Sequence, residues 1–454
     1  MAEGYNKQII EAVGRLAELA RASTVINNEL YLKYDVKRGL RDVNGKGVVC
    51  GLTEISEIIS SKKDETGESV PCEGELYYRG ISIHELVKGA VAAGRFGFEE
   101  TAFLLLFGKL PSKDELNEFI SILADMRALP EYFVRDLIMQ APSPDLMNAL
   151  SRGVLSLYSY DAKADDISIP NILRQVLELI ARFPLLSVYG YNTMMHYHGD
   201  RSLVVHHPSR ALSTAEQILH LLRPDSSFSE LEASIVDIAL ILHAEHGGGN
   251  NSTFTTHVVS SSGTDTYSVI AAALGSLKGP RHGGANIKVV KMFEDMMKSL
   301  KSHSDVAVTD HLAKLLDKQA FDKAGLIYGM GHAVYSLSDP RADILKSYVR
   351  RLAEEKNLME EYTLYEKVER LAPEVIGEKR KIYKGVSANV DFYSGFVYSL
   401  LGLPLELFTP IFAIARMTGW GAHRIEEISN NGKIIRPGYT AVAPRQSYVS
   451  INDR

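Results

Sequence analysis

The sequence predicts a largely α-helical fold with a minor β element near the N-terminus. From about Ile81 onward, apolar residues recur at spacings of three and four, and Gly or Pro ends most of these runs. Strand-like alternation is scarce after residue 80 and is concentrated in residues 24–75. The chain has 454 residues, two to three times the length of an ordinary domain, so we expect two lobes with a substantial core.

The N-terminal part of the chain should hold one helix and one small hairpin. Residues 1–23 form a charged amphipathic pattern without the uninterrupted apolar stretch of a secretion signal, which indicates a helix of the mature protein. Residues 48–56, VVCGLTEIS, are the candidate strand, and residues 62–69, KKDETGES, are the candidate turn. Farther on, Gly108 should end one helix, and Pro111 with Ser112 should open the next.

The domain organisation follows from a shift in composition. Residues 284–390 are richer in charge and should form the smaller helical domain, while residues 1–283 and 391–454 form the larger one. The longest apolar stretch covers residues 392–417, long enough to raise the question of a membrane span. Pro404, Glu406 and Pro410 interrupt it, so two short buried helices joined by a turn are favoured instead.

Charge and cysteine usage exclude several classes of protein. The chain carries 50 Lys and Arg against 56 Asp and Glu, a net charge of −6, which argues against a general binder of nucleic acid or anionic membranes. An anionic small-molecule substrate is still compatible with this net charge if basic residues are concentrated at its binding site. With only Cys50 and Cys72, a disulfide framework and a cysteine zinc site are not expected, and a cytoplasmic location fits.

Two histidine clusters precede glycine-rich turns, with an apolar helix expected at residues 266–277 between them. His243 and His246 should share one face at the end of a helix that Gly247 to Gly249 terminate. Imidazoles at this spacing beside Glu245 can ligate zinc, but HAEH is not HExxH and no third ligand lies at motif distance, so no metal is expected. The alternative is a pair of histidines that cap a helix.

The other candidate histidines also lie beside glycines. His282 precedes a helix expected from Ala285 to Leu300, whose N-terminal field favours a neutral imidazole that can donate to a carbonyl oxygen. His332 follows a Gly-x-Gly turn. Asp339 and Pro340 then have the pattern of an N-cap followed by the first helical residue. This helix start would fix the direction of Arg341, which could bind a carboxylate. The alternatives are an exposed turn histidine and an ordinary surface helix start.

Asp391 begins the apolar run and is either a helix cap or a base that removes a proton from carbon. Arg416 and Arg436 are cations in otherwise apolar or turn-like sequence, and neither is informative alone.

Six motifs in this order resemble the citrate synthase family: HAEHGGGN, GPRHGGAN, GMGHAVYSLSDPRAD, NVDFYSGF, FAIARMTGW and IIRPGY, within residues 76–439. The resemblance implies an almost entirely α-helical homodimer whose small lobe closes over a cleft between the lobes, without a metal or redox cofactor. It further implies a Si-type acyltransferase that converts acetyl-CoA, oxaloacetate and water to citrate and CoA.

The resemblance also implies roles for individual residues. His282 would hydrogen-bond the thioester carbonyl while Asp391 removes a methyl proton, and His332 would polarise the keto oxygen of oxaloacetate. His246, Arg341, Arg416 and the partner subunit's Arg436 would hold carboxylates. The CoA adenine would lie against the backbone of Leu326, Ile327, Tyr328, Gly329, Met330 and Gly331. The segment AVYSLS lacks the basic residue that the family often places there for a CoA phosphate.

Two alternatives stay open at this point. A 2-methylcitrate synthase would use propionyl-CoA, which has one methylene more than acetyl-CoA. An enzyme pocket discriminates between two substrates that differ by one methylene by only about 1–3 kcal/mol. A non-catalytic helical binding or regulatory protein could share the fold, but the presence of both His282 and Asp391 speaks against it.

Overall fold

The computed structural model describes residues 7–42, 46–280, 282–332, 334–380 and 385–453. They fall into two compact units, residues 1–52 and residues 53–454. The first unit contains α1 (Lys7–Thr24), α2 (Asn28–Lys33) and the short turn η1 (Arg38–Leu40), none of whose residues is buried. Helix α1 confirms the predicted N-terminal helix, although residues 1–6 of that prediction lie outside the described residues.

A three-stranded antiparallel sheet opens the second unit, in the order β1 (Ser56–Lys63), β2 (Ser69–Tyr78) and β3 (Ile81–Ser82). The hairpin and its turn are confirmed, because Asp64 accepts hydrogen bonds from the backbone N–H groups of Thr66 and Glu68. The placement of the first strand in residues 48–56 was wrong, since only the last of these residues belongs to β1. Their apolar residues are instead mostly exposed, and the backbone hydrogen bonds from Val48 to Leu40 and from Arg79 to Ile55 are isolated and do not form a ladder.

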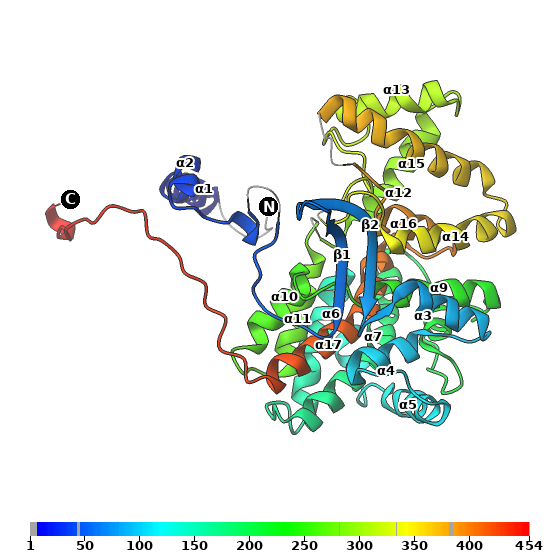
Figure 1. Cartoon of the computed structure of the whole chain (residues 1–454). Helices are drawn as coiled ribbons and strands as arrows, with labels where there is room; N and C mark the ends of the chain where they lie inside the picture. The colour runs from blue at the N-terminus through cyan, green and yellow to red at the C-terminus, as the bar shows by residue number, and fades with distance from the viewer. Residues whose placement is uncertain (1–6, 43–45, 281, 333, 381–384, 454) are drawn as a thin grey trace. The chain divides into compact units, whose positions relative to one another are not determined.

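The rest of the second unit is helical, which confirms the all-α class with a minor β element (Figure 1). Its helices are α3 (Ile83–Ala92), α4 (Phe98–Phe107), α5 (Lys113–Met126), α6 (Leu146–Leu157), α7 (Ile169–His198), α8 (Thr214–Leu222), α9 (Glu230–His243), α10 (Asn251–Ser260), α11 (Thr266–Lys278), α12 (Ala285–Ser299), α13 (Asp305–Leu316), α14 (Pro340–Glu355), α15 (Met359–Arg380), α16 (Val390–Leu400) and α17 (Phe408–Ser429).

Local sequence signals set several of these boundaries. Gly108 adopts a left-handed conformation with φ of 77° and ends α4 as predicted. Ser112 opens α5 with a capping box, in which its hydroxyl accepts from the backbone N–H of Glu115 while the Glu115 carboxylate accepts from that of Ser112.

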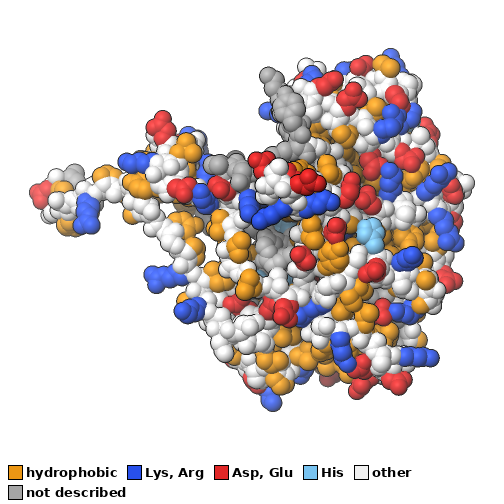
Figure 2. Space-filling view, viewed as in Figure 1, with side chains coloured by type: hydrophobic (Ala, Val, Ile, Leu, Met, Phe, Trp, Pro, Cys, Tyr) orange, Lys and Arg blue, Asp and Glu red, His pale blue; other side chains and the backbone are white. Residues whose placement is uncertain are grey.

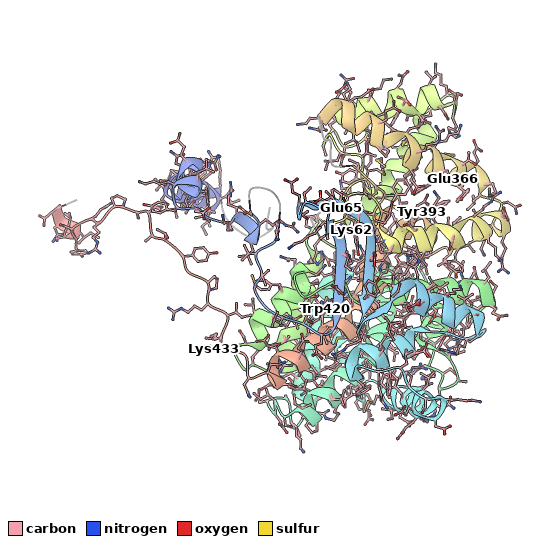
Figure 3. All side chains as sticks on the ribbon, in the orientation of Figure 1. Lys62, Glu65, Glu366, Tyr393, Trp420 and Lys433 are labelled. Carbon is pink, nitrogen blue, oxygen red and sulfur yellow. The ribbon has the colours of Figure 1, made fainter. Side chains whose placement is uncertain are left out.

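The apolar run of residues 392–417 forms two buried helices, as predicted. Helices α16 and α17 are joined by residues 401–407, which include the short turn η4 (Leu405–Leu407). Among the described residues, no helix has the length and apolarity needed to cross a membrane. Helix α17 is buried from Phe408 to Arg424 and packs against α4, α7, α9, α10 and α11. Trp420, fully buried, lies on this central helix (Figure 3).

Helices α12 to α16 pack on one another and lie together at the upper end of the second unit in Figure 1. Most of them fall within residues 284–390, although the exact domain boundaries proposed from the sequence remain predictions. On the face drawn in Figure 2, acidic and basic side chains are mixed and form no single basic field.

The contact between α17 and α7 generates a stability prediction. A Cβ atom added at Gly421 would overlap with Cγ1 of Val176, whereas one added at Gly89 in α3 would meet nothing within 4 Å. Gly421→Ala should therefore lower the free energy of unfolding by about 1–3 kcal/mol. Gly89→Ala should hold it constant or raise it by up to about 1 kcal/mol. Denaturant titration of both variants checks this, and equal effects would contradict the proposed packing.

Candidate active site

Arg416 on α17 is the buried cation of the candidate site. Its side chain is almost fully buried, with Nε donating to the carbonyl oxygen of His243 at 2.7 Å and the guanidinium 4.8 Å from the ring centroid of Phe412. Among the described residues, its Nη1 and Nη2 atoms have no hydrogen-bond partner. Two buried donors without an acceptor indicate a place for an anion.

Three candidate imidazoles lie within the electrostatic field of this arginine. Burial, with the charges of Arg341 and Arg416, lowers the pKa of His243 and His246 well below the usual value. Burial, with the charge of Arg416, lowers the pKa of His282 to about 4. All three imidazoles are therefore neutral at pH 7. The neutral state predicted for His282 agrees with this, but the main cause is burial and not the helix N-terminus.

His282 is held from two sides. Thr409 of α17 donates to the carbonyl oxygen of Gly283 at 2.9 Å, which fixes the loop beside α17. The Nε2 atom of His282 lies 3.2 Å from Oγ of Ser252 on α10, and Trp420 Nε1 donates to the same oxygen at 3.2 Å. The ring is mostly buried, so the alternative of an exposed turn histidine is wrong.

His246 and His332 face one another. Their ring centroids lie 5.4 Å apart, and Tyr335 lies 5.6 Å from the first and 5.1 Å from the second. Nδ1 of His332 accepts from the backbone N–H groups of Val334 at 3.0 Å and Tyr335 at 3.1 Å. Because Nδ1 is an acceptor, the ring proton is on Nε2, which can donate to a ligand oxygen.

The prediction that His243 and His246 share a helix face was wrong. Helix α9 ends at His243, and His246 lies beyond that end. The His243 ring stacks on Phe412 with centroids 4.1 Å apart, whereas His246 faces His332. The C-cap is Ala244, so these histidines do not cap the helix through their side chains either. The i,i+3 argument failed because the helix stops between the two residues.

The start of α14 has the predicted form, with Asp339 as N-cap and Pro340 in the first position. Arg341 is buried and makes a bidentate ion pair with Asp339, at 3.0 Å from Nε and 2.8 Å from Nη2. Asp339 also accepts from the backbone N–H of Val390 at 3.1 Å, so one carboxylate joins α14 to α16. Burial rules out the surface-helix alternative.

Asp391 does not act as the cap of α16. Asn389 does, because its side-chain oxygen accepts from the backbone N–H of Asp391 at 3.0 Å, while its amide donates to the carbonyl of Gly331 at 2.7 Å. Burial raises the pKa of Asp391 to about 6, with the charge of Arg341 opposing the shift and that of Asp339 adding to it. The charge of Arg416 also lowers this pKa, as it lowers that of His282.

The segment predicted to contact CoA lies against the start of α16. The backbone N–H of Asn389 donates to the carbonyl of Gly329 at 2.9 Å, and Met330 bridges to Ala388. Leu326 is exposed, Ile327 is buried, and the Tyr328 hydroxyl donates to Asp322 at 2.7 Å. Arg436 is exposed in the C-terminal tail. The roles predicted for this segment and for Arg436 remain predictions.

Several site residues were not singled out from the sequence. Ser252, Tyr335 and Asn389 each contact a predicted residue, and Trp420 contacts Ser252. The sequence offered only a partial indication of these residues, namely their position beside a candidate. Ser252 directly follows HAEHGGGNN, and Asn389 lies two residues before Asp391. A hydroxyl or amide that orients another side chain has no periodicity or spacing of its own.

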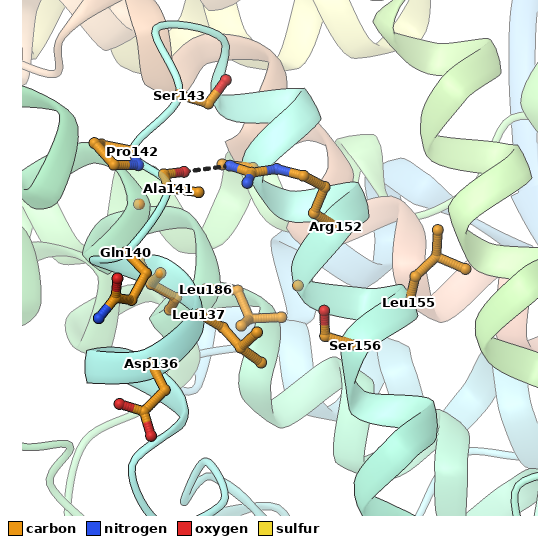
Figure 4. A pocket seen from close by; sticks show the side chains of 14 residues that line it. Asp136, Leu137, Gln140, Ala141, Pro142, Ser143, Arg152, Leu155, Ser156 and Leu186 are labelled. Atoms are coloured by element: carbon orange, nitrogen blue, oxygen red, sulfur yellow. Dashed lines mark hydrogen bonds between the residues drawn. The ribbon is translucent and has the colours of Figure 1, made fainter.

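A separate cavity of about 300 Å³ lies between α6, α7 and η2 (Val134–Ile138), where Arg152 donates to the carbonyl of Ala141 (Figure 4). None of the predicted site residues lines it.

Comparison with known proteins identifies relatives over most of the chain. Residues 40–438 match the family model described as citrate synthase, C-terminal domain. The chain is 35% identical to the citrate synthase of Synechocystis sp., over 84% of this chain and 89% of that protein. It is 33% identical to the 2-methylcitrate synthase of Shewanella oneidensis, over 82% and 90%. A solved citrate synthase from Thermoplasma acidophilum, in a ternary complex with carboxymethyl coenzyme A and oxaloacetate, superposes with a TM-score of 0.76 at 28% identity, covering 92% of this chain and 99% of that chain.

The buried ion pair at the start of α14 generates the second prediction. Asp339→Asn should lower the free energy of unfolding by about 3–5 kcal/mol, because it leaves the buried charge of Arg341 without its partner. Asp136→Asn, which breaks an exposed ion pair with Arg135, is the matched control and should change it little. Chemical denaturation of the two variants measures both free energies of unfolding. A small effect for Asp339→Asn would show that the pair does not join α14 to α16.

Proposed function

The chain belongs to the citrate synthase family, an enzyme family of acyltransferases, and we propose that it condenses acetyl-CoA with oxaloacetate and water to give citrate and CoA. The observation that carries the proposal concerns two groups whose pKa values are both lowered by the charge of the buried Arg416. These are His282, which is neutral, and Asp391, which can ionise. The methyl group of a thioester is a weak acid. A carboxylate removes its proton only if the developing oxyanion is stabilised at the same time.

The reaction begins at the thioester. Asp391 takes a proton from the methyl carbon, and the electron pair of the C–H bond moves towards the carbonyl oxygen, which accepts a hydrogen bond from His282. The hydroxyl proton of Ser252 can reach His282 Nε2 at 3.2 Å or the side-chain oxygen of Asn250 at 2.9 Å. When Ser252 donates to Nε2, the proton of a neutral His282 is on Nδ1, which becomes the donor to the thioester oxygen.

The second half of the reaction forms the carbon–carbon bond. The enol carbon attacks the keto carbon of oxaloacetate while His332 donates from Nε2 to the keto oxygen, which gives citryl-CoA. Water then cleaves the thioester and releases citrate and CoA. The free Nη atoms of Arg416, Nη1 of Arg341 and the imidazole of His246 would hold the substrate carboxylates. This chemistry needs no metal or redox cofactor, because protein groups stabilise the oxyanion and no net electron transfer occurs.

We further propose a homodimer in which the partner subunit's Arg436 completes the carboxylate site, since Arg436 of the same chain lies in an exposed tail. The backbone of residues 326–331 would contact the adenine of CoA. A cytoplasmic location is supported by cysteine usage, because Cys50 and Cys72 are both free thiols. The Si stereochemistry remains a prediction.

The second candidate function is 2-methylcitrate synthesis from propionyl-CoA. It is supported by relatives of that name at 33% and 30% identity. The same residues would perform the same steps on a substrate with one more methylene. The ratio of kcat/KM for acetyl-CoA to that for propionyl-CoA, measured with saturating oxaloacetate, distinguishes the two.

A thiol-release assay with Asp391→Asn tests the proposed reaction. The wild-type protein should release CoA from acetyl-CoA only when oxaloacetate is present. Asp391→Asn should lower kcat by at least about 10²–10⁴-fold, because the base is lost, while its affinity for oxaloacetate stays nearly unchanged. Asp136→Asn is the control and should keep full turnover. No thiol release by the wild-type protein would favour a non-catalytic binding protein, and undiminished turnover of Asp391→Asn would remove Asp391 from the role of base.

The pH dependence of the reaction follows from the pKa of Asp391. Asp391 must be ionised to accept a proton, so kcat/KM for acetyl-CoA should fall about tenfold per pH unit below about 6 and level off above it. His282 stays neutral down to about pH 4 and does not limit the rate in this window. Initial rates between pH 4.5 and 8, with circular dichroism to confirm folding, measure the profile. A flat profile to pH 4.5 would contradict the assignment.

A further inference from the structure

We propose that His257, His423 and Glu426 form a binding site for one divalent transition-metal ion, of which Zn²⁺ is the best fit, outside the reacting cleft. His257 lies on α10, and His423 and Glu426 lie on α17. The three candidate ligand atoms are Nε2 of His257, Nδ1 of His423 and a carboxylate oxygen of Glu426, all within 4.8 Å of one another. The inference does not depend on the reaction proposed above.

Two of the three distances between these atoms are close to those of a tetrahedral zinc site. Nε2 of His257 lies 3.1 Å from Nδ1 of His423, which lies 3.5 Å from Oε2 of Glu426. Ligands that bind Zn²⁺ at about 2.0–2.2 Å in a tetrahedron lie roughly 3.3–3.5 Å apart. Small side-chain movements would therefore bring three ligands to one ion and leave a fourth position for water.

A carboxylate lies beside the outer nitrogen of each imidazole, which is the ring nitrogen that does not take part in the contact between His257 and His423. Nδ1 of His257 lies 2.7 Å from Oε2 of Glu427, and Nε2 of His423 lies 3.2 Å from Oε1 of Glu245. Histidines that bind metals usually donate their second N–H to a carboxylate. The His257–Glu427 pair has this geometry, whereas Nε2 of His423 is within ion-pair distance of Glu245 but makes no hydrogen bond among the described residues. With both outer nitrogens protonated, the inner nitrogens present two lone pairs across 3.1 Å, so a proton or a cation must lie between them.

Glu426 contributes a further acceptor directed at the same point. Its Oε1 accepts from the backbone N–H of Glu54 at 2.8 Å, whereas its buried Oε2 has no hydrogen-bond partner among the described residues. Three carboxylates thus surround two imidazoles. The charge of Arg416 acts on Glu245, and that of Arg79 on Glu426, so two of these carboxylates also have a guanidinium nearby.

The cluster can be reached from solvent. The side chains of His257, Glu426 and Glu427 are 14%, 13% and 15% exposed, whereas His423 is fully buried. The site therefore lies just below the surface. Glu245, which holds His423, directly precedes His246 in the chain, so an ion at this position would stabilise the segment that carries His246.

Metal titration of the full-length protein tests the proposal. After EDTA treatment and desalting, Zn²⁺ should bind with one equivalent per chain by calorimetry and raise Tm, and Co²⁺ should give the visible absorption of a tetrahedral complex. Glu426→Gln and His257→Asn should each weaken Zn²⁺ binding by at least about 100-fold. Glu427→Gln should weaken it by about 10–100-fold through the loss of the outer hydrogen bond.

His196→Asn removes an exposed histidine on α7 and is the matched control, for which the affinity should not change. The Co²⁺ spectrum of the wild-type protein is independent of any variant's folding. Absence of stoichiometric Zn²⁺ binding and of a tetrahedral Co²⁺ spectrum in the wild-type protein would show that a proton joins the two imidazoles, and would overturn the proposal. Binding that persists unchanged in Glu426→Gln and His257→Asn would place the ion elsewhere and overturn it as well.

Discussion

The buried guanidinium of Arg416 is the constraint on which the candidate site depends. Removing a cation from water is costly unless it is paired, and the protein meets only part of this requirement through the carbonyl of His243 and the face of Phe412. Burial lowers the pKa of Arg416 to about 10, so it stays charged at neutral pH. The carboxylates of Glu245 and Asp391 act on this charge, but among the described residues its two Nη atoms have no hydrogen-bond partner, and we propose that a substrate carboxylate binds there.

Burial, together with the same charge, accounts for the ionisation state of the candidate catalytic groups. Burial and the nearby arginines disfavour imidazolium, so His246 and His282 are neutral and each can donate one N–H. Asp391 experiences both tendencies, because burial favours its protonated form whereas Arg341 and Arg416 favour the carboxylate. A carboxylate with a pKa of about 6 is ionised at neutral pH and is more basic than an ordinary aspartate. The same buried, positively charged environment therefore keeps the candidate donor His282 neutral and the candidate base Asp391 ionisable.

Much of the fold was predictable because its signals are local. The capping box at Ser112, the left-handed Gly108 and the interrupted apolar run after residue 391 all act through neighbouring residues. The misplaced strand and the shared face assigned to His243 and His246 depended on tertiary contacts that no local pattern encodes.

The site was predictable to a lesser extent, and mainly where motifs were available. His282, His332, Asp391 and Arg416 came from motifs, and the structure brings them into one electrostatic neighbourhood. The supporting role of Ser252, Trp420 and Asn389 was not predicted, although the last two lie within the quoted motifs, because an orienting hydrogen bond leaves no pattern in the sequence. The proximity of His257 and His423 was also not predictable from the sequence. His423 lies 166 residues from His257, so the search for a third ligand near HAEH could not find either.

The most direct test of the account is a crystal structure of the wild-type protein with oxaloacetate bound. We expect a substrate carboxylate at about 2.7–2.9 Å from Nη1 or Nη2 of Arg416, with the keto oxygen within hydrogen-bond distance of Nε2 of His332. Oxaloacetate bound at a position that leaves both Nη atoms of Arg416 without an anionic partner would contradict the central claim.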